Sequence, residues 1–378
     1  MKLVIISHTE HYCNANGVIV GWGPTINEIN HLIEDFDEIT HIAMLHTTNI
    51  PQSSIPYMSS KINFIPIPVL GGNTLFSKLK LLLYTPIILK IVFKEIIKAD
   101  IFQLRTPTGI GVYLIPFLTF FINKNGWYKY AGNWNQKNPP LGYLIQRWML
   151  KKQTRIVTIN GQWENQSKNI VAFENPCLTI EDRILGKLII DKKELTKKMD
   201  YCFVGELNYN KGIDKIIEAF SGLSNDHIGT LHIVGNGQLK EEIENKAKLL
   251  SINVKVYGAL HKSKVYEVYK NSHFIILPSK NEGFPKVIGE AMNFGCVPIV
   301  SDISCISQYV ENEQNGFLIR PNTVENLKKI ITEKIFHFTN EEYKLFMKRN
   351  YVLANKFTYE YYKERLNKEI INKNHYKK

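Results

Sequence analysis

The sequence contains few cysteines, and none of them lies in a pattern that binds metal. The five are Cys13, Cys177, Cys202, Cys296 and Cys305, which form no C-x-x-C pair and no zinc-like spacing. Histidines and cysteines do not cluster with ligand spacing either. We therefore expect reduced thiols in a cytoplasmic protein, no disulfide framework and no bound metal.

The sequence also lacks a hydrophobic run long enough to cross a membrane. Its two most apolar stretches, 79–93 and 109–122, are shorter than the ~20 residues that span a bilayer, and Pro86 and Lys90 interrupt the first. The N-terminal M-K-L-V-I-I-S-H predicts a first strand and not a signal peptide, because its apolar run is short and no small-residue cleavage site follows. We expect neither a transmembrane helix nor export.

Acidic residues are outnumbered by basic ones. The chain has 47 lysines and arginines against 35 aspartates and glutamates, and the net charge of +12 divides equally between residues 1–180 and the rest. Such an excess favours an anionic partner, but no zinc finger, RNP-like aromatic motif or basic repeat indicates nucleic acid. Anionic phospholipid, a sugar nucleotide or a lipid diphosphate fits better. The segment 76–98 mixes lysines with leucines and isoleucines, which suits either a helix on an anionic membrane surface or a core helix with solvated lysines.

Strand-like and helix-like stretches alternate along the chain. This alternation predicts an α/β protein with two Rossmann-like, doubly wound parallel-sheet domains, whose functional loops follow the carboxyl ends of the strands. A charged stretch without strand pattern, 181–198, places the connection between the domains near residue 180. The predicted strands are 2–7, 38–45, 61–66, 100–104, 127–130 and 155–159 in the first half, and 201–204, 230–234, 253–257, 274–277 and 297–300 in the second.

The segment 281–301 carries the most functional information. Glu282 lies before a predicted helix and Glu290 inside it, while Gly283 permits an unusual backbone angle and Pro285 suits a first helical position. Because an apolar strand feeds this helix, its free N–H groups and its dipole form an anion site, most often for phosphate. Glu290 is placed to accept hydrogen bonds from neutral hydroxyls, as on a ribose. For this pair alone, a capped surface helix with two solvated acids is the alternative.

Several motifs follow one another in the second half of the chain. F-V-G-E-L-N-Y-N-K-G starts at Phe203, L-H-I-V-G-N-G at Leu231 and L-P-S at Leu277, and then come E-G-F-P, E-A-M, G-C-V-P-I-V-S and N-G-F-L. In this order they resemble the donor-site signature of family 4 glycosyltransferases, which are retaining enzymes of the GT-B fold. Each motif is weak alone, but the ordered set covers residues from about 200 to 330.

The resemblance implies a division of labour between two domains that face each other across a cleft. Residues 1–180 would form the acceptor-binding domain, completed by the C-terminal helix 357–378, and residues 181–356 would bind the nucleotide sugar. Glu282 would bind donor-sugar hydroxyls and Lys211 would stabilise the departing diphosphate, so these two are the predicted catalytic residues. The predicted donor-binding residues are Gly205, Glu206, Lys211, Gly235, Gly258, Gly283, Phe284, Pro285 and Glu290.

Two of these residues leave alternatives open. Gly235 either closes a tight turn after a strand or lies close to the nucleotide. Glu206 stands where the family has a basic residue, and a carboxylate beside a diphosphate opposes departure of the leaving group. It must therefore turn away, contact a sugar hydroxyl or be offset by a cation such as Arg105, Lys280 or Lys286; otherwise catalysis has been lost.

The acceptor side is predicted from loops of the first domain. Gly17 and Trp22 follow the first strand, in a glycine-containing stretch that matches the relatives loosely. Many relatives have a histidine after the fourth or fifth strand, whereas the loops here read Q-L-R-T-P-T-G and Y-A-G-N-W-N. Arg105, Asn133 and Trp134 are the candidates for the same space. A transfer in which the donor phosphate acts as the base needs no such histidine.

These observations lead to one prediction of function and one alternative. The protein is predicted to be a retaining, metal-independent hexosyltransferase that needs no cofactor besides its nucleotide-sugar substrate, with UDP as the expected nucleotide. Its acceptor would be a lipid-linked glycan of capsule or O-antigen synthesis at the inner face of the cytoplasmic membrane. The alternative is a catalytically silent GT-B protein that binds glycan or scaffolds a polysaccharide-synthesis complex.

Overall fold

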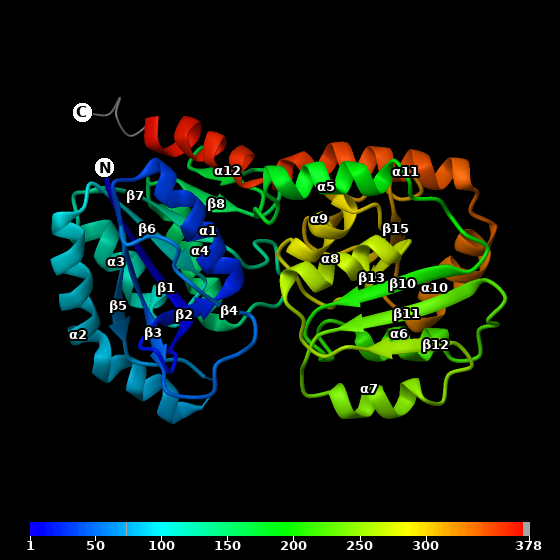
Figure 1. The fold of residues 1–378 in the computed structure, drawn as a ribbon. Coiled ribbons are helices and arrows are strands. Elements are labelled where there is room, and N and C mark those ends of the chain that lie inside the picture. The colour runs from blue at the N-terminus through cyan, green and yellow to red at the C-terminus, as the bar shows by residue number, and fades with distance from the viewer. Residues whose placement is uncertain (73, 373–378) are drawn as a thin grey trace. The chain divides into compact units, whose positions relative to one another are not determined.

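The chain folds into two units. The computed structural model describes residues 1–72 and 74–372. One unit consists of Met1–Glu174 with Tyr362–Lys378, and the other of Asn175–Tyr361 (Figure 1). The boundaries predicted from the sequence lie a few residues away, because Cys177 and Leu178 donate backbone hydrogen bonds to the carbonyl of Phe357 and Leu178 bridges to Thr358. These pairings keep both connecting segments with the second unit.

The first unit contains a nine-stranded sheet. Its parallel strands lie in the order β5-β3-β1-β6-β7-β8-β9, and β2 and β4 add to it in antiparallel fashion. The strands are β1 (Lys2–Cys13), β2 (Ile19–Trp22), β3 (Glu38–His46), β4 (Ser54–Pro56), β5 (Ile62–Ile67), β6 (Ile101–Thr106), β7 (Asn125–Tyr130), β8 (Val157–Ile159) and β9 (Ile170–Ala172).

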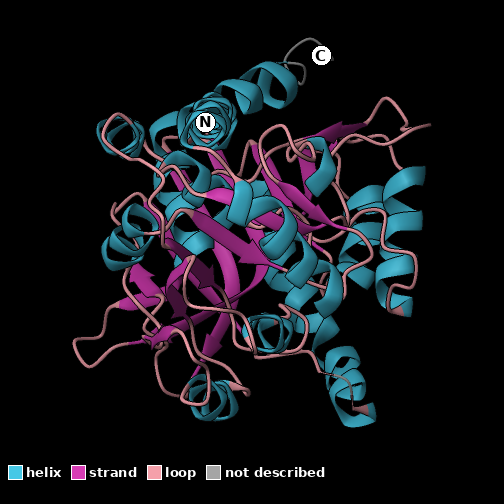
Figure 2. Ribbon diagram, turned by 90° about the vertical axis from the view of Figure 1, so that its right-hand side faces the viewer, coloured by secondary structure: helices cyan, strands magenta, loops and turns pink. Residues whose placement is uncertain are grey.

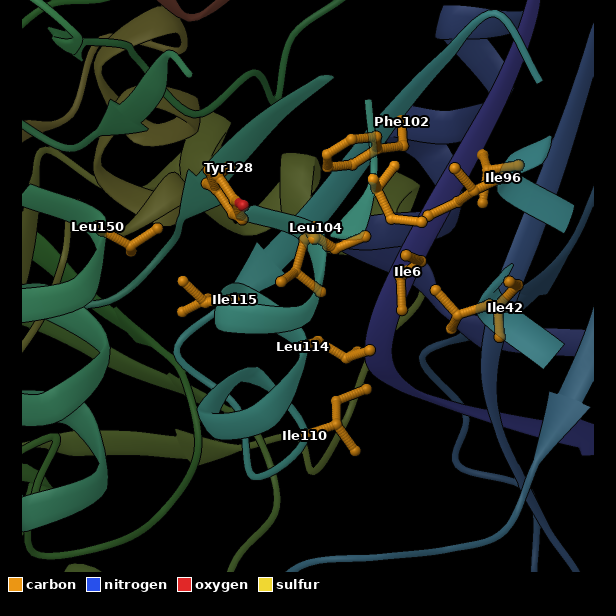
Figure 3. Close-up of a cluster of buried hydrophobic side chains, with 14 of the residues drawn as sticks. Ile6, Ile42, Ile96, Phe102, Leu104, Ile110, Leu114, Ile115, Tyr128 and Leu150 are labelled. Atoms are coloured by element: carbon orange, nitrogen blue, oxygen red, sulfur yellow. The ribbon is translucent and has the colours of Figure 1, made fainter. Parts of the chain in front are cut away.

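Helices cover both faces of this sheet. Figure 2, coloured by secondary structure, shows helices on the outside and strands between them. On one face, α2 (Leu75–Lys98), α3 (Gly111–Phe121) and α4 (Leu141–Lys152) pack on a core in which Ile6 and Leu104 of the sheet meet Leu114 and Ile115 of α3 (Figure 3). On the other face, α1 (Gly23–Leu32) packs together with the C-terminal helical segment, in which α12 (Tyr359–Leu366) lies. None of the helices in the described ranges combines the length and the apolarity that crossing a membrane requires.

The first strand is longer than its hydrophobic pattern indicates. β1 continues past Ser7 to Cys13 with a shift of register between Ile6 and Glu10, and its extension pairs with β2. The extension is polar in sequence yet buried in the structure: His11 is fully buried and its Nε2 lies 2.8 Å from the Tyr57 hydroxyl. Side-chain hydrogen bonds stabilise this extension in place of apolar contacts. The prediction of strands depends on apolar residues and therefore does not include the hairpin.

The second unit contains a six-stranded parallel sheet in the order β12-β11-β10-β13-β14-β15. The strands are β10 (Met199–Val204), β11 (Ile228–Val234), β12 (Asn253–Val256), β13 (Phe274–Leu277), β14 (Val297–Ser301) and β15 (Phe317–Ile319). The helices are α5 (Ile180–Ile190), α6 (Ile213–Phe220), α7 (Lys240–Ala247), α8 (Lys262–Asn271), α9 (Lys286–Asn293), α10 (Val324–Lys329) and α11 (Asn340–Ala354). The order of strands reverses between β10 and β13, and this is the place in a doubly wound sheet where ligands bind.

A buried group of charges ties the C-terminal helix to the first unit. The Glu28 carboxylate, 2% exposed, accepts hydrogen bonds at 2.6 Å from both Arg105 and Lys129. Tyr362 of α12 donates to the same oxygen at 3.2 Å, and the Lys129 ammonium lies 4.7 Å from the centre of the Tyr362 ring. Two cations and a hydroxyl therefore converge on one carboxylate oxygen.

We expect Glu28→Gln to destabilise the protein by about 3–5 kcal/mol, because it leaves two buried cations without their counter-charge. Glu34→Gln is the matched control, since that carboxylate pairs with Lys363 on the surface and its loss should change stability by less than about 0.5 kcal/mol. Urea unfolding of the three proteins measures both effects. Equal midpoints for the two variants would show that the Glu28 group contributes nothing.

Candidate functional site

The candidate site of the second unit is built by the two loops at the reversal point of its sheet. The loop after β10 and the loop after β13 are joined by two hydrogen bonds: the N–H of Lys280 donates to the carbonyl of Asn210 at 2.7 Å, and the Asn210 amide donates to the carbonyl of Asn281 at 3.1 Å. Gly212 brings them closer still. A Cβ at this position would lie 2.4 Å from the Pro278 carbonyl oxygen, and its φ of +74° also favours glycine.

The two predicted catalytic side chains meet across these loops. Lys211 Nζ donates to Glu282 Oε1 at 2.5 Å, and the side chains are 24% and 11% exposed. They lie far apart in the sequence, and the strand order brings them together. Both side chains are partly exposed. The ammonium can bind a phosphate, and the carboxylate can accept hydrogen bonds from sugar hydroxyls.

Backbone groups at the start of α9 face the same loop. Pro285 is the residue that caps α9, one position earlier than the sequence predicts, and no side chain caps the helix. The N–H groups of Gly283 and Phe284 have no hydrogen-bond acceptor among the described residues. The Phe284 ring is buried and stacks on Phe357 at 4.7 Å, so only its main chain is left for a ligand. A helix start of this kind attracts anions.

Glu290 lies in the middle of α9, whereas Glu282 precedes the helix. Its Oε2 accepts a hydrogen bond of 3.3 Å from the Tyr269 hydroxyl. Burial raises the pKa of the Glu290 carboxyl, against the opposing effect of the lysines Lys262 and Lys286. Part of the side chain still reaches solvent. An acceptor group that is dehydrated but accessible is suited to neutral hydroxyls, whose hydrogen bonds compensate its buried charge.

The glycines after β11 are required by the backbone around them. A Cβ on Gly235, where φ is +142°, would lie 1.8 Å from the Gly205 carbonyl oxygen, and one on Gly237 would lie 2.4 Å from that of Leu207. The N–H of Gly235 also donates to the carbonyl of Gly258 at 2.8 Å. Of the two roles considered for Gly235, the close approach of the backbone supports the structural one. Gly235 and Gly237 set the path of the loop that carries Glu206 and Lys211.

Glu206 is exposed at the start of this loop. In the part of the chain that the structure describes, its carboxylate has neither a hydrogen bond nor an ion pair. Lys280, one of the cations suggested to offset it, instead lies 6.0 Å from the centre of the Tyr209 ring. The carboxylate is thus not neutralised locally, and the departure from the family pattern is real in the structure as well as in the sequence.

The first unit places its predicted acceptor residues in different surroundings. Gly17, with a φ of +75°, lies in the turn of the β1–β2 hairpin, where its N–H donates to the carbonyl of Asn14. Trp22 ends β2 and is 51% exposed. Neither lies in a glycine-rich loop of the expected kind, because β1 runs on into a hairpin.

Of the other three acceptor candidates, Arg105 lies near the end of β6, and Asn133 and Trp134 follow β7. Arg105 is committed to the buried Glu28, and a second nitrogen of its guanidinium donates to Thr25 at 3.2 Å. Trp134 is buried and packs edge to face on Tyr130. Asn133 accepts a hydrogen bond from the N–H of Asn135 at 3.0 Å. Arg105 and Trp134 thus contribute to the interior of the unit and offer little surface to a ligand.

One polar group near the candidate site, Asp182, was not predicted from the sequence. Asp182 accepts hydrogen bonds of 2.9 Å from both Lys262 and Tyr266, beside Glu290. Its capping-box spacing from Thr179 is visible in the sequence, but its partners come from α8 and only the fold reveals them. In the first unit, His8 lies in the irregular part of β1, and burial lowers its pKa to about 4. Its Nε2 has no hydrogen-bond partner among the described residues.

Acidic residues elsewhere do not assemble a metal site. The sequence contains a D-x-D pair, Asp35 and Asp37, at the surface of the first unit, where Asp37 binds the N-terminal ammonium. In the described ranges, no three or more His, Cys, Asp or Glu residues group in a way that could hold a metal ion. That the reaction needs no metal stays a prediction.

Sequence comparisons point to one class of protein. Residues 187–337 match the family model described as glycosyl transferases group 1. The chain is 34% identical over 173 residues to an uncharacterized glycosyltransferase of Haemophilus influenzae, covering 44% of this chain and 46% of that protein. It is 21% identical over 212 residues to an uncharacterized 41.2 kDa protein in the cps region of Klebsiella pneumoniae, covering 53% and 57%. The chain therefore spans about half the length of these curated relatives.

Structural comparisons establish the fold. Sucrose-phosphate synthase from Thermosynechococcus elongatus matches with a TM-score of 0.72 at 14% identity, over 97% of this chain and 98% of that one. Anabaena HepE in complex with UDP-glucose matches with a TM-score of 0.69 at 14% identity, over 98% and 100%. Staphylococcus aureus TarM, solved with UDP and other ligands, matches with a TM-score of 0.54 at 18% identity, over 70% and 54%. The predicted fold class, GT-B, is confirmed.

We expect Gly235→Ala to destabilise the second unit and to displace the loop that carries Lys211, because the added methyl group would overlap the Gly205 carbonyl. Gly222→Ala is the matched control: its φ of +75° is also positive, but nothing lies within 4 Å of the new Cβ. The control isolates the conformational cost, about 1 kcal/mol, and Gly235→Ala should exceed it by about 2 kcal/mol in urea unfolding. Similar losses in both variants would contradict the close approach.

We expect Glu290→Gln to raise the Tm of the ligand-free protein at neutral pH by about 1–3 °C. A carboxyl whose pKa is raised by folding destabilises the folded state when it is ionised, and this cost disappears as the pH falls through the folded pKa. The advantage of the variant should therefore shrink as the pH is lowered towards about 4.5. Differential scanning fluorimetry measures this, with Glu244→Gln on exposed α7 as control. A Tm below wild type at every pH would contradict it.

Proposed function

We propose that this protein is a retaining glycosyltransferase of family 4 that moves a hexose from a nucleotide sugar to a glycan acceptor, without a metal ion. The observation that carries the proposal is the Lys211–Glu282 pair at the reversal point of the second sheet. Cleavage of an anomeric C–O bond needs positive charge beside the leaving diphosphate and hydroxyl-binding groups beside the sugar. The pair supplies one of each, within hydrogen-bond reach.

Each donor-site residue has a role in this proposal. The Lys211 ammonium and the N–H groups of Gly283 and Phe284 would stabilise the charge that develops on the diphosphate. Glu282 would accept hydrogen bonds from the sugar hydroxyls, and Glu290 from those of the ribose. The donor phosphate itself would take the proton of the acceptor hydroxyl, so the sugar is transferred on the face from which the nucleotide leaves and no covalent enzyme intermediate forms.

UDP is the nucleotide that we propose. The support is that HepE and TarM, which share the fold, have been solved with UDP, and HepE also with UDP-glucose. The distance of both relatives in sequence means that the base has to be tested and not transferred by analogy.

The acceptor that we propose is a lipid-linked glycan of capsule or O-antigen synthesis, used at the inner face of the cytoplasmic membrane. The basic character of the chain favours a substrate that carries a lipid diphosphate in an anionic membrane. The relative encoded in a cps region supports a role in surface polysaccharide.

A catalytically silent protein that binds glycan or scaffolds an assembly is the second candidate, and the unpaired carboxylate of Glu206 is the observation that favours it. Glu206→Arg separates the two. If the wild type neither binds nor hydrolyses a nucleotide sugar and the variant gains either property, the silent protein is the better description. If the wild type is active, Glu206 is tolerated in a working site.

We expect UDP-sugars, out of a panel of UDP-, GDP-, ADP- and CMP-sugars without metal, to raise the Tm of the purified protein. The shift should be lost in Glu290→Ala, while Lys211→Ala should retain binding and slow donor hydrolysis or transfer by about 10²-fold. Lys246→Ala, which changes an exposed lysine on α7, is the matched control and should behave as wild type. The absence of a shift with every donor, or unchanged kinetics in Lys211→Ala, would overturn the site assignment.

A further inference from the structure

Helix α2 of the first unit is apolar on the side that faces away from its core. The inward side, including Ile88, Val92 and Ile96, is fully buried against the sheet. The outward side nevertheless carries large apolar residues that are between 46% and 76% exposed: Phe76, Leu79, Leu82, Leu83, Ile87, Phe93 and Ile97. A helix that is hydrophobic all round is normally buried on all sides. The outer side of α2 is therefore a surface for which a partner must be sought.

Helix α4 carries a second exposed apolar stripe. Leu141, Leu144, Ile145 and Trp148 are spaced by three and four residues, which places them on one side of the helix, and Trp148 is 62% exposed. The exposed Phe120 and Phe121 end α3. Apolar patches of this extent are uncommon on monomeric proteins and mark interaction sites.

The three helices form one layer on the same face of the sheet. All of them pack on the same core, and α3 contacts α4. Helix α2 also approaches the start of α3: a Cβ on Gly109, two residues before α3, would lie 3.5 Å from the Leu81 side chain of α2. We use the name "apolar helical face" for the outer side of this layer, with the residues given in the two preceding paragraphs. All three helices contribute residues to this face.

The charge around the apolar helical face has one sign. From Ile39 to Trp163 the sequence contains 14 lysines and arginines, and its only acidic residues are Glu95 and Asp100. Glu95 is paired with Lys98 in α2. The exposed lysines of α2 and α4 are Lys78, Lys90, Lys94, Lys98, Lys151 and Lys152. A surface that combines exposed apolar side chains with uncompensated lysines is complementary to an anionic lipid bilayer, in which acyl chains receive the former and headgroup phosphates the latter.

We propose that the apolar helical face docks the first unit onto a bilayer that contains acidic phospholipid. A second copy of the chain fits the same surface less well, because a symmetric contact would bring like-charged lysines against one another. Docking through this face leaves the helices lying in the interface and none of them spanning it. From its sequence, the segment 76–98 suits either a helix on an anionic membrane surface or a core helix with solvated lysines. The exposure of its outer apolar residues favours the membrane surface.

The direction of the helices relates the docked face to the functional loops of the first unit. In a parallel α/β sheet each helix begins near the carboxyl ends of the strands, where functional loops lie. The four most exposed apolar residues of α2 lie between Phe76 and Leu83, near its start, and the most exposed one of α4, Leu141, is its first residue. This end of the docked face would thus adjoin the loops after β5 and β7. This step rests on the proposed function, in which the acceptor is lipid-linked; the docking itself does not.

Vesicle flotation tests the proposal with the complete protein and no sugar ligand. The probes are vesicles of phosphatidylcholine alone and of phosphatidylcholine with about one third phosphatidylglycerol. We expect the wild type to float with the anionic vesicles and to remain in solution with the neutral ones. High salt should weaken the binding, because it screens the lysines. Leu83→Ser with Trp148→Ser should weaken it at least about tenfold, since both remove apolar surface that would enter the interface.

Matched controls separate docking from folding and from donor binding. Leu249→Ser with Val352→Ser removes two exposed apolar residues of the second unit and should float as the wild type does. The thermal shift with a nucleotide sugar is measured on all variants, so that loss of flotation with an intact shift concerns the membrane alone. The proposal is overturned if the wild type does not float, if Leu83→Ser with Trp148→Ser floats unchanged, or if sedimentation shows a dimer that this variant dissociates.

Discussion

The close approach of backbone to backbone at the centre of the second sheet is the constraint on which the candidate site depends. The loop after β10 passes so near to the turn after β11 that Gly235 and Gly237 have no room for a Cβ, and so near to the loop after β13 that Gly212 has none either. The path of this one loop sets the position of Lys211. Steric exclusion of side chains, and not attraction between charges, therefore decides where the ammonium meets Glu282. The ion pair is a consequence of the packing, and its partners could not be brought together by a chain with larger residues at these positions.

The sequence allowed the fold class and the positions of the two loops of the candidate site to be predicted, because both depend on local patterns. Apolar strands such as β10 and β13 end at glycines and prolines, and the E-G-F-P motif stands where a strand gives way to a helix. The hairpin of β1 and β2 could not be predicted in this way. Its strand is buried through a histidine and a tyrosine that bind each other, and such pairs are invisible until the residues at 11 and 57 are known to be neighbours.

The surroundings of the acceptor candidates could not be predicted from the sequence either, because they depend on residues distant in the chain. Arg105 follows a strand and carries a charge, which are the usual marks of a functional residue, but its charge is matched by Glu28 from a different helix. One carboxylate serving Arg105, Lys129 and Tyr362 makes these residues part of the framework. A functional arginine and a structural one differ only in what faces them, and that information resides in tertiary contacts.

The pairing of Lys211 with Glu282 restricts the kinds of ligand that the candidate site can bind. A small anion that draws the ammonium to itself leaves the carboxylate without a counter-charge in a partly dehydrated place, so phosphate alone gains little. A polyol without a phosphate would bind the carboxylate and leave the Lys211 ammonium without its counter-charge. Only a molecule that presents phosphate and hydroxyls together satisfies both ends at once. In the proposed reaction the leftover nucleotide no longer carries the donor-sugar hydroxyls that Glu282 would bind. The two side chains can then rejoin, and the re-formed pair would compete with the product for the site and hasten its departure.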